Sequence, residues 1–217
     1  FSSKQKLENG FIVDEDGIIK ECNDGIRRHI VDTKDLKLKG MHNFQNICTA
    51  LALTKGLVDM DKAVETIKEF SGVHHRLELV RTIDGVEWYN DSASTTPTRG
   101  ISALNSFNKE IVLIAGGADK NLDYTPIAKP IVEKVKCLIL IGQTANKIYE
   151  AVKKELEKQN KHLDIHMCET FKQSLELAKR VAEPGQVVLF SPASTSFDMF
   201  KDMYDRGDKF KEEVMKF

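Results

Sequence analysis

The stretch IVLIAGGADKNLDY, from Ile111 to Tyr124, decides the fold. Its first five residues are apolar and mostly β-branched, which is typical of a strand buried on both faces of a parallel sheet. Gly116 and Gly117 follow directly and allow the backbone to turn sharply and to approach a ligand closely. Because ligands in open α/β sheets lie beyond the carboxyl ends of the strands, Asp119 and Lys120 stand where chemistry is expected. A plain turn with a solvated lysine explains this stretch, taken alone, equally well.

The composition is that of a globular protein with balanced charge. The chain has 217 residues, of which 41% are hydrophobic and 30% charged, so it can bury a substantial core. Its 32 basic and 33 acidic residues give a net charge of −1, which favours neither nucleic acid nor a membrane as a partner. We find no apolar run of membrane-spanning length and no signal-peptide pattern. The cysteines are far apart in the sequence, so we expect neither a zinc site nor disulfides, and we expect a cytoplasmic location.

Residues 1–72 predict a small sheet followed by two helices. Two apolar pieces around the turn at residues 14–17 indicate a β-hairpin over residues 10–19, and residues 30–31 and 36–38 add short extended pieces. Helical spacing predicts one helix around residues 44–51 and a second from Asp59 that ends at Ser71-Gly72. We place a domain boundary at about residue 72.

From residue 73 onward strands and helices alternate. The expected strands cover residues 77–83, 86–89, 111–115, 137–141, 163–167 and 187–190. Helices are expected from Thr96-Pro97, at 126–134, from Ala145, from a Thr170–Gln173 capping box, and from about Phe197 to the end. This alternation predicts an α/β fold, a Rossmann-like, doubly wound and mostly parallel sheet.

Two polar segments, one at the entrance to the first helix and one just past the domain boundary, are candidates for nucleotide contacts. Asn43 and Asn46 lie three residues apart at the entrance to the first helix, and a carboxamide can both donate to and accept from an adenine edge. Simple helix capping is the stronger interpretation on local grounds. In His74-His75-Arg76, adjacent histidines on extended backbone would point to opposite faces and make poor joint metal ligands. Arg76 either contacts a phosphate or ribose, or forms a salt bridge.

Two hydroxyl-rich loops each follow an apolar strand and precede an expected helix. They are Asn90–Pro97 and Ser191–Asp198, and the N–H groups of a helix N-terminus attract anions. Asp91 is placed to hold ribose hydroxyls, although both loops are also explained as capping loops. Together with Lys120 they would suit a small dicarboxylate. The sequence contains neither a G-x-S-x-G nucleophile motif nor a P-loop, so a complete ATP cradle is not expected in these residues.

The order of five motifs is more specific than any one of them. From about Gly40 to the C-terminus the chain reads G-x-H-N-x-x-N, H-H-R-x-E, N-D-S-x-x-T-x-P, G-G-x-D-K and S-P-A-x-x-S-F-D-x-F. This order resembles the Mur ligases, and within them the members that add D-glutamate to UDP-N-acetylmuramoyl-L-alanine in peptidoglycan synthesis. The resemblance implies a C-terminal fragment, which fits a chain that starts at Phe1. Residues 1–72 would be the end of the central ATP-binding domain, and residues 73–217 the C-terminal Rossmann-like domain.

The resemblance also implies roles for single residues. Asn43 and Asn46 match positions that face adenine, and Arg76 and Asp91 match nucleotide contacts. The positions that hold the two carboxylates of D-glutamate are matched by Thr95, Lys120 and Ser196, with a contribution from the backbone N–H of Met203. These groups would position reactants and would not act as nucleophiles.

One departure from the family pattern concerns the loop after Asp91. Ala93 stands where the family often has a lysine, which weakens the case for phosphate binding by this loop. The resemblance implies ATP and Mg²⁺ as cofactors, with the metal ligands and the P-loop in the missing part, and a monomer that is inactive as this fragment alone. Two alternatives stay open: a folylpolyglutamate-type or other Mur ligase, and a non-catalytic nucleotide- or anion-binding module.

Overall fold

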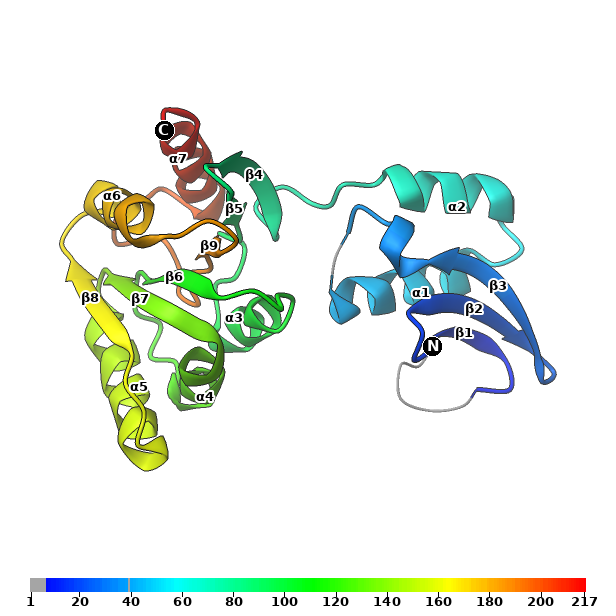
Figure 1. Cartoon of the computed structure of the whole chain (residues 1–217). Coiled ribbons are helices and arrows are strands. Elements are labelled where there is room, and N and C mark those ends of the chain that lie inside the picture. The colour runs from blue at the N-terminus through cyan, green and yellow to red at the C-terminus, as the bar shows by residue number, and fades with distance from the viewer. Residues whose placement is uncertain (1–6, 39) are drawn as a thin grey trace. The chain divides into compact units, whose positions relative to one another are not determined.

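The computed structural model describes residues 7–38 and 40–217 of the chain. It divides into two compact units, Phe1–Gly72 and Val73–Phe217, each with a core of its own (Figure 1).

The first unit is a three-stranded antiparallel sheet with two helices. Its elements are β1 (Gly10–Val13), β2 (Ile18–Asn23), β3 (Ile26–Asp32), the 3₁₀ turn η1 (Thr33–Asp35), α1 (Met41–Thr54) and α2 (Met60–Glu69). The predicted hairpin over residues 10–19 and both predicted helices are confirmed, and the Asp59 side chain caps α2. At residues 36–38 the backbone of Leu36 is extended as predicted, with φ of −86° and ψ of 139°, but the segment forms none of the strands of the described sheet. Leu36 instead buries its side chain in the core, with 2% exposed, directly after η1.

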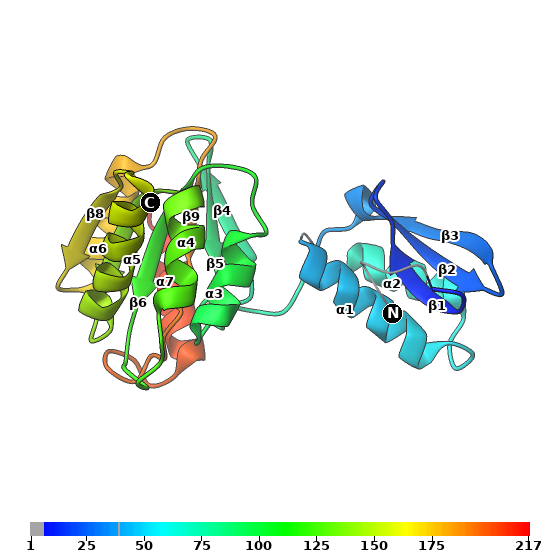
Figure 2. The same ribbon diagram turned by 90° about the horizontal axis from the view of Figure 1, so that it is seen from below.

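The second unit is a six-stranded sheet covered by helices on both faces. Its elements are β4 (Glu78–Ile83), β5 (Val86–Asn90), α3 (Pro97–Leu104), β6 (Ile111–Gly116), α4 (Thr125–Lys134), β7 (Val135–Ile141), α5 (Ala145–Gln159), β8 (Asp164–Cys168), α6 (Phe171–Val181), β9 (Val187–Phe190) and α7 (Met203–Met215). The strand order is β4-β5-β9-β6-β7-β8, and only the β4–β5 pair is antiparallel (Figure 2). The predicted α/β fold with a doubly wound, mostly parallel sheet is therefore confirmed.

Alternate residues of β6 build two different cores. Leu113 and Ala115 pack into the cluster that holds α3, α4 and α5, whereas Val112 and Ile114 pack into the cluster that holds α6 and α7. Figure 1 shows these two helix groups on opposite sides of the sheet. Because successive side chains of a strand point to opposite faces, a continuous apolar run is what a strand covered on both faces requires.

The two glycines at the carboxyl end of β6, Gly116 in the strand and Gly117 directly after it, allow a close approach, but the partner is the protein itself. Gly116 has φ of +111°, and a Cβ there would lie 2.0 Å from the carbonyl oxygen of Ile141 on β7. A Cβ on Gly117 would lie 2.3 Å from the carbonyl oxygen of Thr195. The glycines therefore let neighbouring backbone segments pack together at the carboxyl end of the sheet.

The last helix begins later than the sequence predicts. α7 starts at Met203 instead of near Phe197, because residues 191–202 form an irregular loop that pairs with the chain after β6 through an Ala118–Thr195 bridge. The Asp202 side chain then caps α7 by accepting from the N–H groups of Tyr204 and Asp205. The second anion-accepting helix N-terminus expected directly after the last strand is thus wrong, since a carboxylate of the chain already occupies that N-terminus.

Candidate functional site

Three loops meet at the carboxyl ends of the adjacent strands β5, β9 and β6. The loops after β9 and β6 are joined by backbone bonds, since Gly116 N–H donates to Pro192 O (2.8 Å) and Ala118 N–H to Thr195 O (2.8 Å). At the end of β5, the N–H of Asp91 donates to Phe190 O at 2.8 Å. The predicted residues Thr95, Lys120 and Ser196 stand on these three loops, one on each. The sheet topology therefore gathers them at one edge, where α/β proteins bind ligands.

Arg206 ties two of these loops together from the first turn of α7. Its guanidinium donates to Ser92 Oγ (2.9 Å), Ser92 O (2.8 Å) and Ser194 O (3.0 Å), and only 1% of the residue is exposed. Burial lowers the pKa of Arg206 to about 10, and the charges of Asp198 and Asp91 partly offset this shift, so the side chain is cationic at neutral pH.

The motifs of the sequence assign Arg206 no role of its own, although a signal is present. Arg206, Phe210 and Val214 lie four residues apart along α7, and all three are buried. An arginine at the apolar period of an amphipathic helix is a candidate for a buried, multiply bonded cation.

A buried group of hydroxyls fixes the loop after β6 against the start of α5. Ser194 Oγ lies 2.6 Å from the hydroxyl of Tyr124 and 2.8 Å from Thr144 Oγ1. Thr144 Oγ1 in turn accepts from the N–H of Gly117 at 3.0 Å. Each of these three side chains is almost fully buried, so the hydrogen bonds make the backbone around Gly117 rigid.

Lys120 presents a positive charge that no acidic side chain of the described residues pairs with. Its neighbour Asp119 is bound by Lys147 Nζ at 2.5 Å, which lowers the pKa of Asp119, and also accepts from the N–H of Asn121. Lys120 itself is exposed, with Nζ 5.8 Å from the centre of the Phe197 ring. Among residues 7–38 and 40–217, no ion pair involves Lys120. The cation next to the loop of Ser196 is therefore available to an anionic ligand.

The other residues predicted to hold the amino acid differ in exposure. Ser196 is 1% exposed, and Thr95 is half-buried in the loop after β5. Met203 is the first residue of α7, and its carbonyl accepts from Ser92 Oγ at 2.8 Å. Because the Asp202 cap takes the N–H groups of the two residues that follow Met203, the Met203 N–H lies outside this cap.

Asp91 has internal partners for both carboxylate oxygens. One accepts from the N–H of Leu77 at 3.2 Å and the other from Ser191 Oγ at 2.7 Å, and the residue is 1% exposed. Burial raises the pKa of Asp91 to about 6, while hydrogen bonds from Ser94 and Ser191 pull it back down. In this structure the carboxylate therefore links the ends of β5 and β9 to the segment before β4.

Arg76 is exposed, and the acidic residue two positions on, Glu78, is engaged elsewhere. The Glu78 carboxylate lies 2.7 Å from Lys211 Nζ on α7 and accepts from the N–H of His75 at 2.9 Å. The histidine pair lies in a turn and not on extended backbone, since His75 has φ of +63°. His74 is exposed and His75 is 4% exposed, so the two rings still meet different surroundings.

Asn43 and Asn46 both lie in the first half of α1, in the first unit. Asn43 is 9% exposed, whereas Asn46 is exposed to solvent. The two predicted carboxamides therefore differ in exposure, one being buried and the other open to solvent.

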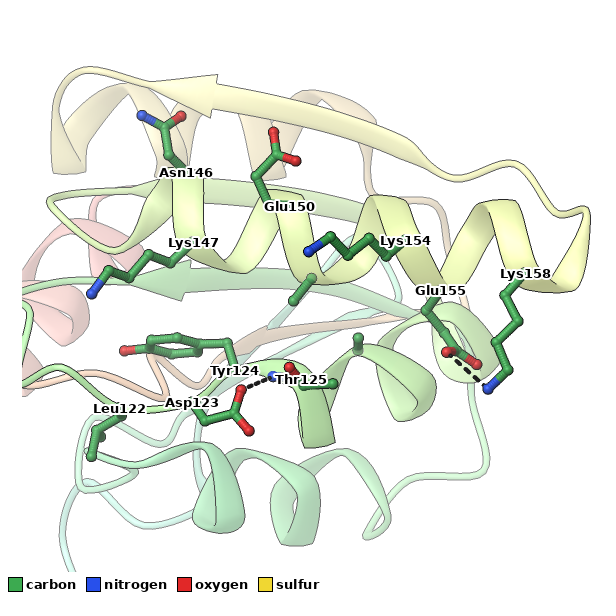
Figure 3. Close-up of a pocket in the computed structure, with 12 residues that line it drawn as sticks. Leu122, Asp123, Tyr124, Thr125, Asn146, Lys147, Glu150, Lys154, Glu155 and Lys158 are labelled. Carbon is green, nitrogen blue, oxygen red and sulfur yellow. Dashed lines mark hydrogen bonds and ion pairs between the residues drawn. The ribbon is translucent and has the colours of Figure 1, made fainter.

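A groove of about 540 Å³ lies beside the start of α4 and along α5, and none of the predicted residues lines it (Figure 3). Three lysines and three carboxylates line it: Lys147, Lys154, Lys158, Asp123, Glu150 and Glu155. Because these charges balance, the groove selects no class of charged ligand. None of the helices in the described part of the chain is long and apolar enough to cross a membrane.

Comparison with known proteins identifies the family of this chain. Residues 75–194 match the family model described as Mur ligase, glutamate ligase domain, and this match covers more than half of the chain. The chain belongs to the Mur ligase family. The resemblance inferred from the five motifs is therefore confirmed, and the Mur ligase domain includes the loops after β5 and β6 and the start of the loop after β9.

Two curated relatives carry the same name. The UDP-N-acetylmuramoylalanine--D-glutamate ligase of Acetivibrio thermocellus is 44% identical over 217 residues, and that of Clostridium tetani is 41% identical over 215 residues. Each match covers 99% of this chain and 46% of the relative. The chain therefore spans about half the length of these curated relatives.

Solved structures of low identity share the fold. MurF from Acinetobacter baumannii has a TM-score of 0.64 at 15% identity, covering 96% of this chain and 46% of that one. A bifunctional folylpolyglutamate synthase/dihydrofolate synthase with Mn, AMPPNP and L-glutamate bound has a TM-score of 0.61 at 12% identity, covering 94% of this chain and 46% of that one. The fold of this Mur ligase chain is therefore also found in these solved structures.

Proposed function

We propose that this chain is the C-terminal part of an ATP-dependent amide ligase that adds D-glutamate to UDP-N-acetylmuramoyl-L-alanine. The observation that carries the proposal is the 44% identity, across 99% of the chain, to a relative with that activity in its name. The three loops at the carboxyl edge of the sheet support it, because the uncompensated cation of Lys120 suits a dicarboxylic amino acid.

In this proposal the loops position the amino acid for attack on an activated carboxylate. Lys120 neutralises one carboxylate of D-glutamate, and the hydroxyls of Thr95 and Ser196, with the Met203 N–H, supply neutral donors. Their contribution is proximity and charge stabilisation. Arg206 fixes the loops of Thr95 and Ser196 relative to each other, through its bonds to Ser92 and Ser194.

The nucleotide contacts of the proposal rest on two residues of each unit. We assign residues 1–72 to the end of the central ATP-binding domain and residues 73–217 to the C-terminal ligase domain. Asn43 and Asn46 would face adenine, and Arg76 and Asp91 would contact the rest of the nucleotide. ATP and Mg²⁺ are the proposed cofactors, in keeping with the nucleotide and divalent metal bound to the folylpolyglutamate synthase relative, and the P-loop and metal ligands belong to the complete enzyme.

We further propose that the complete enzyme is a cytoplasmic monomer that acts on soluble substrates, without a nucleic-acid or membrane partner. The near-neutral charge balance of the chain supports this proposal.

The test is phosphate release by the complete parent protein with UDP-N-acetylmuramoyl-L-alanine, ATP and Mg²⁺. D-glutamate, L-glutamate, L-lysine and meso-diaminopimelate are compared as the added amino acid. We expect release that depends on D-glutamate alone. Release with another amino acid would keep the ligase class and reject the substrate, whereas no release with any of the four would favour a binding module.

Replacing Lys120 with alanine in the complete enzyme tests the proposed carboxylate contact. We expect kcat/KM for D-glutamate to fall about a hundredfold, roughly 3 kcal/mol of transition-state stabilisation, because a charge pair is lost. The KM for ATP should change little. Lys136→Ala is the matched control, since Lys136 is an exposed lysine near the amino end of β7. Unchanged D-glutamate kinetics in Lys120→Ala would remove Lys120 from the site.

A further inference from the structure

A second group of ligand-type side chains lies on the outer part of the sheet, between β7 and the edge strand β8. Cys137, Asp164 and His166 each offer one ligand atom, and these atoms all lie within 4.8 Å of one another. We propose that this trio binds a divalent transition-metal ion of the zinc class. The proposal does not depend on the ligase function.

The register of two parallel strands places the three side chains together. Cys137 pairs with Asp164, and Ile139 pairs with His166, so the three donors project from the same face of the sheet. The Nε2 atom of His166 lies 2.9 Å from Asp164 Oδ2. Donors fixed on paired strands need little reorganisation to converge on one ion.

The donor set selects the class of metal. A thiolate and an imidazole favour zinc and cobalt over magnesium and calcium, which prefer oxygen ligands alone. A thiolate and a carboxylate together carry two negative charges, so a divalent ion leaves the site neutral. Cys137 is 4% exposed, whereas Asp164 is exposed and His166 is half-exposed, which leaves a fourth position open to water.

Without an ion the same trio is held together by hydrogen bonds to one carboxylate. Burial raises the pKa of Cys137 to about 12, and Asp164 adds to this shift as the acceptor of the thiol hydrogen bond. His166 bonds to the same carboxylate. A divalent ion would replace these hydrogen bonds with three metal–ligand bonds.

The proposed metal site is separate from the candidate ligase site. Cys137 lies near the amino end of β7 and Asp164 is the first residue of β8, whereas the ligase loops leave the carboxyl ends of β5, β6 and β9. The spacing of the cysteines predicts no zinc site, because it shows no C-x-x-C pair. The three ligands come together only through the pairing of two strands.

The test is a Co²⁺ titration of the full chain, followed by absorption spectroscopy. Cobalt bound to a thiolate gives a charge-transfer band in the near ultraviolet and intense visible bands when tetrahedral, and Zn²⁺ should abolish both while excess Mg²⁺ should not. Cys137→Ser should lose the charge-transfer band, and His166→Gln should weaken Co²⁺ binding by more than about tenfold. Cys168→Ser is the matched control, because Cys168 lies on β8, on the same face, but outside the trio.

Three results would overturn the proposal. They are the absence of a charge-transfer band at saturating Co²⁺, a band that persists in Cys137→Ser, and a band that disappears in Cys168→Ser. Far-UV circular dichroism of each variant verifies folding. Since His166 is half-exposed, His166→Gln gives an independent answer even where Cys137→Ser perturbs the core.

Discussion

Arg206 illustrates how a buried charge is made tolerable by the groups around it. Three donors of its guanidinium meet a hydroxyl and two backbone carbonyls, on two loops that are far apart in the sequence. The carbonyls of Ser92 and Ser194 depend on this side chain for those bonds. Removing the arginine leaves the acceptors buried without a partner, which costs more than the bonds contribute on balance.

Arg206→Met is therefore expected to lower the free energy of unfolding by about 3 kcal/mol, because charged hydrogen bonds are lost and acceptors stay buried. Urea denaturation measures the effect. Arg180→Met is the control, since Arg180 is exposed on α6 and should change stability by less than about 0.5 kcal/mol. Equal stability of the two variants would contradict the structural role of Arg206.

The burial of Asp91 predicts that the free energy of unfolding depends on pH. Its pKa is about 6 in the folded protein against 3.8 for the ordinary group, so the folded state binds the proton more tightly than the unfolded state. The stabilisation from protonated Asp91 is complete below about pH 4 and is lost as the pH rises through 6. Two pKa units correspond to a change on the order of 3 kcal/mol.

The measurement is the difference in unfolding free energy between the wild-type chain and Asp91→Asn, taken from pH 4 to pH 7. Asparagine does not titrate, so shared contributions of the other carboxylates cancel in the difference. We expect the wild type to lose stability relative to the variant across this window. A difference that is independent of pH would show that Asp91 keeps an ordinary pKa.

At the scale of elements, the close packing of β6 on β7 depends on a missing side chain. Gly116 has φ of +111°, and its Cβ position is occupied by a carbonyl oxygen of β7 that is held by the parallel pairing. A substitution there must break sheet hydrogen bonds or push the two strands apart.

Gly116→Ala should accordingly destabilise the second unit by clearly more than Gly185→Ala. Gly185 has φ of +91° and no atom within 4 Å of its Cβ position, so alanine there costs only the backbone strain of about 1–2 kcal/mol. Thermal unfolding of the two variants separates the cost of backbone strain, which both carry, from the cost of the steric clash, which only Gly116→Ala carries. Equal shifts in Tm would mean that the strands can move apart at little cost.

At the scale of the whole molecule, the two units have separate cores. The cluster of the first unit contains Phe11, Ile19 and Leu51, whereas the second unit has one cluster on each face of its sheet. Because the first unit buries fewer apolar side chains, we expect it to be the less stable of the two.

The tryptophan allows the units to be followed separately. Trp88, the sole tryptophan, is 1% exposed on β5, where it packs against Phe217 and Phe210. Its fluorescence should report unfolding of the second unit, at a higher urea concentration than the first change in far-UV circular dichroism. Residues 73–217 expressed alone should keep the fluorescence transition. Coincident transitions, together with loss of the transition in the shorter chain, would show that the units fold as one.

The spacing of apolar residues in the sequence was sufficient to predict most helices and strands. It failed where a long-range contact competed with the local preference of the chain. The segment at residues 36–38 has the composition of a strand, but the extended Leu36 buries its side chain in the core of the first unit and pairs with no strand of the described sheet. The start of α7 was placed too early because Ser191–Asp198 looks locally like a helix entrance. Its pairing with the chain after β6 delays the helix to Met203.

The candidate site, likewise, could be predicted from the sequence only in part. The apolar run at residues 111–115 and the glycines after it determined by themselves that Lys120 lies at the carboxyl edge of a buried strand, because strand burial and strand direction are local properties. Only the tertiary structure decided which loops meet there, and that Arg206 joins them, since β9 is inserted between β5 and β6. Strand order and register bring together residues that are far apart in the sequence, so contacts such as Cys137 with Asp164 have no local signal that could predict them.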